Sequence, residues 1–232
     1  MIYVNPTSNR IPHIEPLFED KSFVSDYDHA IKKLATADYD PVYDFILNGL
    51  DKNSSARILE IGPGPGWLGI ILAQKCPQFQ IIGLDTSEQY LESARENAAQ
   101  EGVADQITYL QGDVCYMEDL DSQSFDAVIS SQSLHYWSPA RNAFNEIARV
   151  LKPGGLFCIE DERRDLTFRG KLAVMLGKYL MARQVRHSWM RSIDGSYTPE
   201  ELKPLLENSD LQDSYELIIR SRLLFVQGQL DE

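Results

Sequence analysis

From residue 56 onward, short runs of apolar and β-branched residues alternate with longer stretches of helical spacing, and this alternation restricts the possible folds. The runs predict strands at residues 56–61, 80–85, 107–111, 126–130 and 156–160. Helices are predicted between them, over residues 68–75, 87–101 and 139–151. Strands that are apolar on both faces and alternate with helices form a parallel sheet covered on both sides. The sequence therefore predicts an α/β domain with a mostly parallel sheet and helices on both faces.

The segment before this alternating region has a different character. The first 25 residues are rich in Pro, Asn and Ser and are predicted to be irregular, while residues 26–37 have helical spacing. Asp40 followed by proline is typical of a helix start, with Asp40 as the cap. We expect residues 1–55 to form an N-terminal arm and helices that act as a lid over the main domain, residues 56–232.

After the fifth strand the alternation stops. A basic helical stretch covers about residues 169–190, another helix is predicted to begin at Thr198, and residues 214–219 and 223–227 have the pattern of a hairpin. The hairpin would add an antiparallel edge strand to the sheet. The segment of about 163–192 is expected to form a helical cap at the carboxyl ends of the parallel strands, where open α/β sheets bind ligands.

Three glycines, Gly62, Gly64 and Gly66, stand where the first strand ends and the next helix begins. Glycine lets a ligand approach the main chain, and a helix N-terminus offers free N–H groups. The dinucleotide fingerprint Gly-x-Gly-x-x-Gly would require glycine at position 67, which is Trp67. Glu60 would repel a pyrophosphate and would suit a positively charged ligand. The turn therefore predicts a nucleotide-like cation, and a nicotinamide-dependent oxidoreductase remains the less favoured alternative.

Residues 60–66 match the first motif of the class I S-adenosylmethionine-dependent methyltransferases, an acidic residue, x, Gly-x-Gly-x-Gly, and the sequence resembles this family. Further pieces follow in the family's order: Asp85 after the second strand, Gly112-Asp113-Val114 after the third, residues 125–130 of the fourth, and residues 151–155 before the fifth. The resemblance is close over about residues 56–161. It implies a Rossmann-like, seven-stranded methyltransferase fold, with a layout similar to small-molecule methyltransferases of the quinone-biosynthesis type.

The resemblance also implies S-adenosyl-L-methionine as cofactor and S-adenosyl-L-homocysteine as product. In the family, the residue matching Asp85 binds both ribose hydroxyls, which suits the two oxygens of a carboxylate, and the residue matching Asp113 binds the adenine amino group. The cofactor-binding residues predicted in this way are Glu60, Gly62, Gly64, Gly66, Asp85, Thr86, Asp113, Val114 and Ser130. No metal is predicted, because the carboxylate and asparagine ligands of the family's magnesium sites are not found.

Each of these residues also has a purely structural explanation. The glycines could form only a tight turn between strand and helix. Asp85 could cap the following helix, and Asp113 could be an ordinary loop residue. Glu60 could form an ion pair with Arg57 or with a lysine. The order and spacing of the five pieces together favour the cofactor site.

Methyl transfer requires the acceptor and the methyl group to be held in line and water to be excluded, and a base only where the acceptor must lose a proton. Residues 130–137 follow the fourth strand and are expected at the site. His135 is predicted as the base because imidazole exchanges a proton near neutral pH. Asp161, after the fifth strand, is the second catalytic candidate. The aromatic candidates for the substrate wall are Tyr136, Trp137 and, from the N-terminal segment, Tyr27 and His29; packing is the alternative role for all of these residues.

The stretch of residues 162–191 carries eight lysines and arginines against two acids. Projected on a helix, Arg183 returns to the apolar face and Arg186 lies near it, so either the helix ends before Arg183 or these arginines face the cleft. A solvated cap helix is one interpretation. A second is that Arg183 or Arg186 binds an anionic group of the substrate. A third is peripheral membrane contact, which would suit a lipid-like acceptor.

Composition limits the remaining possibilities. A net charge of −13 argues against a nucleic-acid partner. Three scattered cysteines without Cys-x-x-Cys argue against disulfides and zinc and favour the cytoplasm, and neither a signal peptide nor an integral membrane segment is expected. We therefore expect a cytoplasmic monomer or homodimer that transfers a methyl group to an O, N or C atom of a small molecule. The alternative is a protein of this fold that binds the cofactor for another reaction or as a scaffold.

Overall fold

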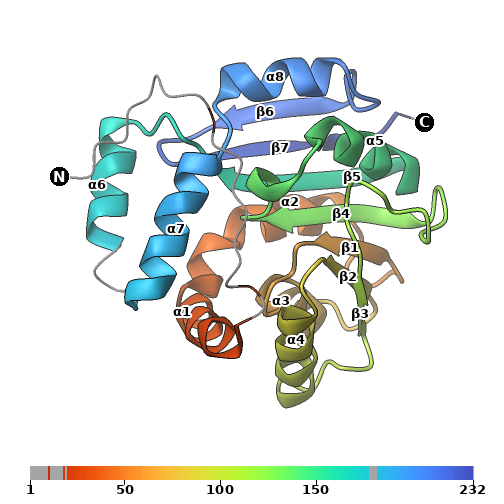
Figure 1. The fold of residues 1–232 in the computed structure, drawn as a ribbon. Helices are drawn as coiled ribbons and strands as arrows, with labels where there is room; N and C mark the ends of the chain where they lie inside the picture. The colour runs from red at the N-terminus through yellow and green to blue at the C-terminus, as the bar shows by residue number, and fades with distance from the viewer. Residues whose placement is uncertain (1–9, 11–17, 19, 178–181, 232) are drawn as a thin grey trace.

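The computed structural model describes residues 10, 18, 20–177 and 182–231, and a sheet runs through the centre of this part of the chain (Figure 1). Its strands are β1 (Arg57–Ile61), β2 (Gln80–Asp85), β3 (Ile107–Gln111), β4 (Phe125–Ser131), β5 (Leu151–Glu162), β6 (Tyr215–Ile219) and β7 (Leu223–Gln229). Within the described residues the sheet has seven strands in the order β3-β2-β1-β4-β5-β7-β6. The first five strands are parallel, and β7 is antiparallel to both β5 and β6. The predicted parallel sheet, extended by an antiparallel hairpin, is confirmed.

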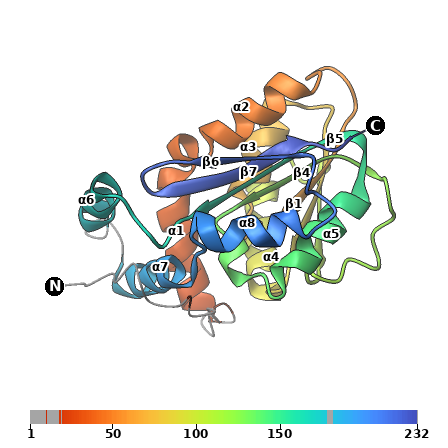
Figure 2. The same ribbon diagram turned by 90° about the horizontal axis from the view of Figure 1, so that it is seen from above.

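Helices cover both faces of this sheet and one of its ends (Figure 2). One face carries α2 (Asp40–Gly49), α3 (Trp67–Lys75) and α4 (Glu88–Gln100), and the other carries α5 (Ala140–Val150) and α8 (Pro199–Glu207). The remaining helices, α1 (Lys21–Asp38), α6 (Phe168–Gly177) and α7 (Arg183–Gly195), lie beyond the carboxyl ends of the parallel strands.

Side-chain alternation along the strands builds two separate cores. Ile58 packs with α2, α3 and α4, whereas its neighbour Leu59 packs with α5 and α8. Because successive side chains of a strand point to opposite faces, Glu60 lies on the same face as Ile58. The order of the strands reverses between β1 and β4, which are direct neighbours. Ligands of open α/β sheets bind at such a switch point.

Several boundaries differ from the predicted ones for local reasons. Helix α1 begins at Lys21, within the segment expected to be irregular, because Asp20 Oδ1 accepts hydrogen bonds from the amides of Ser22 and Phe23 at 2.8 and 3.0 Å. Tyr39, not Asp40, is the N-cap residue of α2. Strand β5 begins earlier than predicted because Leu151 pairs with Phe125. By contrast, β2 and β3 have the predicted bounds, and Thr198 caps α8 as predicted.

The basic stretch is not one continuous helix. Helix α6 ends at Gly177 and α7 begins at Arg183, while residues 178–181 lie outside the described part of the chain. The first of the two alternatives for the arginines is therefore correct, since Arg183 opens a new helix. None of the described helices is both long enough and apolar enough to span a membrane.

Candidate active site

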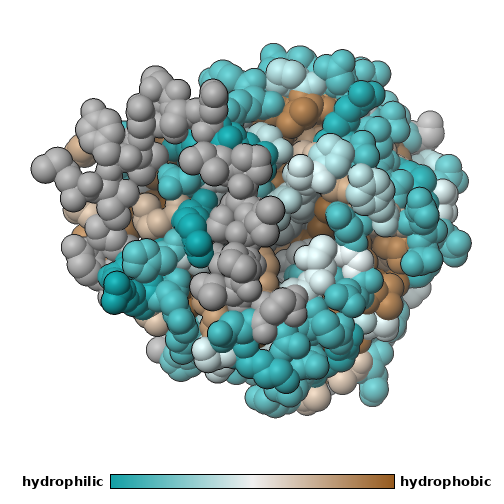
Figure 3. Space-filling view, in the orientation of Figure 1, coloured by the Kyte–Doolittle hydropathy of each residue, from teal (hydrophilic) through white to brown (hydrophobic). Residues whose placement is uncertain are grey.

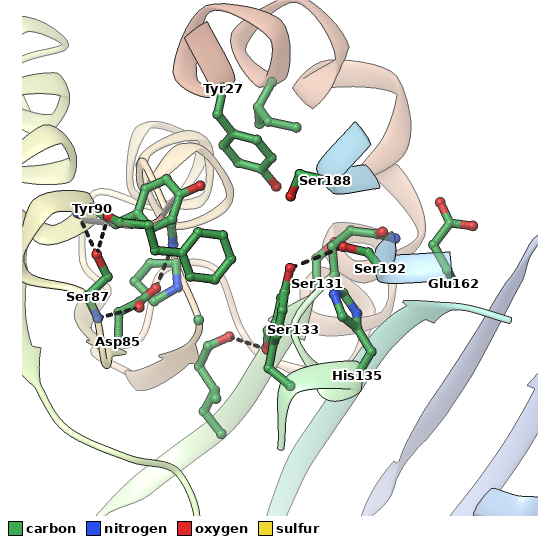
Figure 4. A pocket seen from close by; sticks show the side chains of 18 of the residues that line it. Tyr27, Asp85, Ser87, Tyr90, Ser131, Ser133, His135, Glu162, Ser188 and Ser192 are labelled. Atoms are coloured by element: carbon green, nitrogen blue, oxygen red, sulfur yellow. Dashed lines mark hydrogen bonds between the residues drawn. The ribbon is translucent and has the colours of Figure 1, made fainter. Parts of the chain in front are cut away.

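A cavity of about 800 Å³ lies at the carboxyl ends of β1, β2, β4 and β5, beneath α1 and α7. Figure 4 shows Asp85, Ser87 and Tyr90 on one side of it and His135, Ser192 and Glu162 on the other, with Tyr27 and Ser188 above. We call the first side, formed by the glycine turn and the ends of β2 and β3, the nucleoside end. The second side, formed by the segment after β4, the end of β5 and α7, is the acceptor end.

The glycine turn shapes the nucleoside end with its main chain. Gly62 and Gly64 line the cavity and have φ values of 65° and 53°, which a residue with a side chain rarely adopts. A Cβ atom on Gly62 would lie 2.5 Å from the Cβ of Ser133. Gly66, at φ 85°, is the N-cap of α3 and does not line the cavity; a Cβ there would lie 2.5 Å from the hydroxyl of Tyr109. The first two glycines thus form the wall, and the third permits close packing behind it.

Asp85, the last residue of β2, is fixed by two backbone amides. Its Oδ2 accepts from the amide of Gly64 at 3.1 Å and its Oδ1 from the amide of Ser87 at 3.0 Å. A carboxylate held by its two oxygens in this way can also accept from the two hydroxyls of a vicinal diol. Thr86 lines the cavity beside it. Asp85 is not the cap of α4, since Ser87 is its N-cap; Asp85 instead joins the glycine turn to the start of α4 and faces the cavity.

The end of β3 adds a polar group beside an apolar slot. Asp113 is exposed to the cavity, and its Oδ1 accepts from the amide of Cys115 at 2.8 Å, while Val114 is buried next to it. Phe18 and Tyr90 form an edge-to-face pair 5.1 Å apart on the cavity wall. A flat, apolar ring that carries a hydrogen-bond donor fits these surroundings. The residues present at the nucleoside end therefore fit the adenosine part of the family's cofactor.

Besides Gly66, two more of the predicted cofactor residues, Glu60 and Ser130, are not at the cavity wall. Glu60 is 1% exposed and faces Gly69 of α3, because the alternation of β1 turns it toward the helices rather than toward the strand ends. Burial raises the pKa of Glu60 to about 8. A hydrogen bond from the Gly69 amide lowers this pKa, but its effect is smaller than that of burial. Ser130 is fully buried, with its Oγ 2.7 Å from the Oγ of Ser133. Residues 131–133, which follow it, line the cavity instead.

His135 and Asp161 form a buried pair at the acceptor end. His135 lies in the short 3₁₀ turn η2 (Leu134–Tyr136), and its Nδ1 is 2.9 and 3.0 Å from the two carboxylate oxygens of Asp161. The Asp161 carboxylate also accepts from the backbone amide of His135 at 2.7 Å. When Nδ1 donates to a carboxylate, Nε2 carries the lone pair. This Nε2 is buried and has no hydrogen-bond partner among the described residues, and His135 lines the cavity, whereas Asp161 lies behind it.

The two acids that flank Asp161 point to the opposite face of β5 and line the cavity. Glu160 accepts from Ser131 Oγ at 2.5 Å and from Gln132 Nε2 at 2.9 Å, and burial raises its pKa to about 8. Glu162 Oε1 accepts from Arg222 Nη1 at 2.7 Å and from Trp189 Nε1 at 3.0 Å.

Burial is also the main cause that raises the pKa of Glu162, to about 7, and the charge of Arg222 opposes the shift. The Oε2 atom of Glu162 is buried and has no hydrogen-bond partner within the part of the chain that the structure describes. The acceptor end thus holds a buried oxygen with room for a hydrogen bond from a bound molecule.

The predicted aromatic residues lie around the cavity. Tyr27 reaches in from α1 with its hydroxyl directed toward Ser188 of α7 (Figure 4), and burial, with the charges of Asp85 and Asp161, raises its pKa to about 12. The Tyr136 hydroxyl is 3.1 Å from Ser192 Oγ. Trp137 lines the cavity from below and donates from its ring nitrogen to Ser133 Oγ at 3.1 Å. His29 is exposed and does not line the cavity.

The structure does not bring the two predicted arginines to the cavity. Arg183 is exposed and lines a separate, shallower depression with Asp26, and Arg186 is half-buried away from the main cavity. Because α7 begins anew at Arg183, a different face of the helix points inward. That face carries Val185, Ser188, Trp189 and Ser192. A cation that does line the cavity is Arg222, from the turn between β6 and β7.

Sequence reasoning missed most of the acceptor end. Residues 131–133, which belong to the segment after the fourth strand that was expected at the site, line the cavity. The lining residues that were not predicted include Phe18, Tyr90, Glu160, Glu162, Ser188, Trp189, Ser192 and Arg222. The alternation around Asp161 was a signal that could have found Glu160 and Glu162. No local signal marks the contributions of α7 or of Arg222, because they depend on how distant segments pack.

Metal-binding and thiol chemistry have little support in this part of the chain. Among the described residues, no three His, Cys, Asp or Glu side chains are grouped so that they could hold a metal ion. Cys76, Cys115 and Cys158 are buried and free. The polar groups that line the cavity are carboxylates, hydroxyls, one imidazole and the Arg222 guanidinium, together with amides such as that of Gln132.

The strand order with its antiparallel β7, and a glycine turn facing an acid at the end of β2, define the class I methyltransferase fold. The sequence profile of the family described as "Methyltransferase domain" matches residues 58–155. A solved structure from Methanococcus maripaludis, described as a candidate S-adenosyl-L-methionine-dependent methyltransferase, is 25% identical with a TM-score of 0.74, over 96% of this chain and 98% of that one. Residues 58–155 thus form a methyltransferase domain of the class I S-adenosylmethionine-dependent kind, and the described chain has the fold of that class.

Curated relatives match this chain over part of their length. A sterol 24-C-methyltransferase from Clavispora lusitaniae is 30% identical over 113 residues, which is 49% of this chain and 30% of that protein. A 2-methyl-6-phytyl-1,4-hydroquinone methyltransferase from Oryza sativa subsp. japonica, chloroplastic, is 32% identical over 105 residues, 44% of this chain and 28% of that protein. The matched region is thus less than a third of each relative's own length.

Proposed function

We propose that this chain binds S-adenosyl-L-methionine at the nucleoside end of the cavity and transfers its methyl group to a small-molecule acceptor at the other end. The observation that carries the proposal is the buried Nε2 of His135, which has no partner within the described residues and lies in the same cavity as the glycine turn and Asp85. A base and a nucleoside site in one enclosed cavity are what the transfer to a protic acceptor requires.

The residues of the nucleoside end would bind and orient the cofactor. Gly62 and Gly64 let it approach the main chain, Asp85 accepts from the ribose hydroxyls, and Asp113 accepts from the adenine amino group beside Val114. When bound, the cofactor supplies an electrophilic methyl group on a positively charged sulfur. The acids of the cavity favour a cation over a neutral molecule, because its charge offsets the cost of burying carboxylates.

His135 would accept the proton that the acceptor loses. Asp161 is a positioning residue in this scheme, since it holds the imidazole by Nδ1 and leaves Nε2 directed to the cavity. Helices α1 and α7 would exclude water during the transfer, with Tyr27 and Ser188 facing each other across the cavity. In this proposal α1 acts as a lid. Helix α2 does not, because its residues Val42 and Ile46 are buried in the core.

The acceptor we propose has an apolar body and at least one hydrogen-bond donor. Val185, Trp189, Ala173 and Gly177 offer apolar surface, and Glu162 Oε2 offers a buried acceptor atom for the donor. The sterol and hydroquinone in the names of the two relatives are apolar molecules with hydroxyl groups, which agrees with this description. The methylated atom is left open among O, N and C.

The test combines binding with turnover. Calorimetry with S-adenosyl-L-homocysteine is expected to show binding that weakens roughly 100-fold in Asp85→Ala, because a charged hydrogen-bonding group is lost, while Asp119→Ala, an exposed acid away from the cavity, binds normally. Labelled S-adenosyl-L-methionine is then incubated with a panel of phenols, sterols and amines. Equal affinity of wild type and Asp85→Ala would refute the cofactor site. Tight binding without transfer to any member of the panel would favour the cofactor-binding protein of another function.

A further inference from the structure

Helix α6 exposes its large apolar residues. Phe168 is 83% exposed, Leu172 44%, Met175 47% and Leu176 60%. We call these four residues the exposed face of α6. In a typical surface helix the large apolar residues face the core and the polar residues face solvent. The exposed face of α6 reverses this arrangement and requires an explanation, since contiguous apolar surface of this kind marks interaction sites.

Packing within the chain does not explain the exposed face of α6, because other residues form the inner side of this helix. A Cβ atom on Gly170 would lie 2.2 Å from the carbonyl oxygen of Ser221, in the turn between β6 and β7. Val174 is buried with Leu166 and Ile193. Gly170 and Val174 thus face the body of the molecule, while the four large apolar side chains of α6 remain outside.

Cations border the exposed face on both sides. At 100° per residue, the four apolar side chains cover an arc of about 100°, with Arg169 just beyond one border and Lys171 just beyond the other. Both cations are exposed. The inner side of α6 is also apolar, so the helix has no polar face; its exposed apolar side chains can enter the acyl boundary of a membrane while the flanking cations contact headgroups.

We propose that the exposed face of α6 docks on the surface of an anionic phospholipid bilayer. Most of the described surface in Figure 3 is hydrophilic; tan, apolar atoms lie at the left edge, where α6 lies in Figure 1, and separate brown patches lie at the top and on the right. The net charge of −13 repels an anionic surface from most orientations. The basic border of α6 therefore selects the orientation in which this helix meets the lipid.

If the proposed function holds, docking of α6 on a bilayer would bring lipid close to the acceptor end of the cavity. Ala173 and Gly177, on the inner side of the same helix, line the cavity. A bilayer in contact with the outer side of α6 would lie next to the acceptor end, so an apolar acceptor could pass from lipid to cavity with little exposure to water. Docking itself does not depend on the reaction.

The experiment is sedimentation of the protein with vesicles of phosphatidylcholine, with and without phosphatidylglycerol. Wild type is expected to bind the phosphatidylglycerol vesicles. The double variant Phe168→Asp/Leu176→Asp is expected to bind at least about tenfold more weakly. Tyr116→Asp is the matched control, because Tyr116 is 59% exposed and lies on the loop after β3, and it should bind as wild type does.

A second variant tests the electrostatic part. Arg169→Gln/Lys171→Gln removes two exposed cations without adding charge, and each lost cation should weaken binding about fivefold on anionic vesicles only. Calorimetry with S-adenosyl-L-homocysteine serves as the control for folding and for the nucleoside site, which these substitutions should leave intact.

Three results would overturn the proposal. The first is wild type that does not sediment with phosphatidylglycerol vesicles. The second is binding that neither pair of substitutions weakens relative to Tyr116→Asp. The third is a homodimer in gel filtration that Phe168→Asp/Leu176→Asp dissociates, which would assign the exposed face of α6 to a second copy of this chain.

Discussion

The two ends of the cavity are built in different ways. The nucleoside end comes from short segments that each follow a parallel strand, and its key contacts involve the main chain, as in the amides of Gly64 and Ser87 that hold Asp85. The acceptor end comes from η2, the end of β5, α7 and the turn before β7, and its contacts join side chains such as Glu162, Arg222 and Trp189. Main-chain architecture suits a ligand common to a family, and side-chain architecture suits one particular to the protein.

The ends also differ in how they hold charge. Asp85 and Asp113 at the nucleoside end keep contact with the cavity opening, and their oxygens accept from backbone amides. Glu160 and Glu162 at the acceptor end are almost fully buried, and burial raises the pKa values of both, to about 8 and about 7. A bound molecule therefore meets carboxyl groups with raised pKa values at the acceptor end.

The largest expected effect is on the rate of methyl transfer, and it distinguishes the acceptor end of the cavity from the nucleoside end. His135→Ala should lower the rate of methyl transfer by about 10²–10⁴-fold, because the general base is lost, and should leave the affinity for S-adenosyl-L-homocysteine unchanged. Asp161→Asn should lower kcat with little change in the KM of the acceptor, since the imidazole is misoriented but still present. The measurement is labelled methyl transfer together with calorimetry. A full rate in His135→Ala would show that the acceptor end needs no base.

Within the glycine turn, the free energy of unfolding distinguishes Gly64, which lines the cavity, from Gly66, which packs behind it. Gly66→Ala should reduce the free energy of unfolding by about 3 kcal/mol, from the positive φ and the contact with Tyr109. Gly64→Ala should cost only about 1 kcal/mol, because no atom lies within 4 Å of its Cβ position. Urea unfolding measures both. Equal losses in the two variants would contradict the separate roles of the two glycines.

A smaller effect is expected at the acceptor end from Glu162→Gln. The amide oxygen can still accept from Arg222 and Trp189, but the amide nitrogen replaces the oxygen without a partner, so the hydrogen bond to a donor on the acceptor is lost. The KM of the acceptor should rise about tenfold, with S-adenosyl-L-homocysteine binding unaffected. Steady-state kinetics measure this KM. A weakened affinity for S-adenosyl-L-homocysteine would place Glu162 at the nucleoside end instead.

The smallest effect concerns pH. Since burial raises the pKa of Glu60 from 4.5 to about 8 in the folded state, the folded chain binds more protons than the unfolded chain between these values, and stability falls as pH rises. Glu60 should contribute a loss on the order of 1 kcal/mol between pH 7 and pH 8. Urea unfolding of Glu60→Gln at both pH values should show a shallower loss than wild type. The same dependence in both proteins would assign the effect to Glu160 and Glu162.

Sequence reasoning predicted the nucleoside end because its residues occupy fixed places after strands. It missed the direction of Glu60, although period-two alternation from Ile58 already points that side chain toward α3. It could not locate the inward face of α7, because α7 is a separate helix and its inward face does not follow from the spacing of residues in α6. The pair of Glu162 and Arg222 joins residues 60 positions apart, and only the pairing of β5 with β7 brings them together.

The turn between β6 and β7 touches two features at once. Ser221 lies against Gly170 of α6, and its carbonyl accepts from the amide of Thr167 at 3.2 Å. The next residue, Arg222, holds Glu162 in the cavity. A shift of this turn displaces both the helix proposed to meet lipid and the ion pair proposed to meet the acceptor. If lipid docking and acceptor binding both move this turn, the two proposed binding events would be linked, and by reciprocity each would strengthen or weaken the other to the same degree. This turn is where activation of the enzyme by an interface would originate.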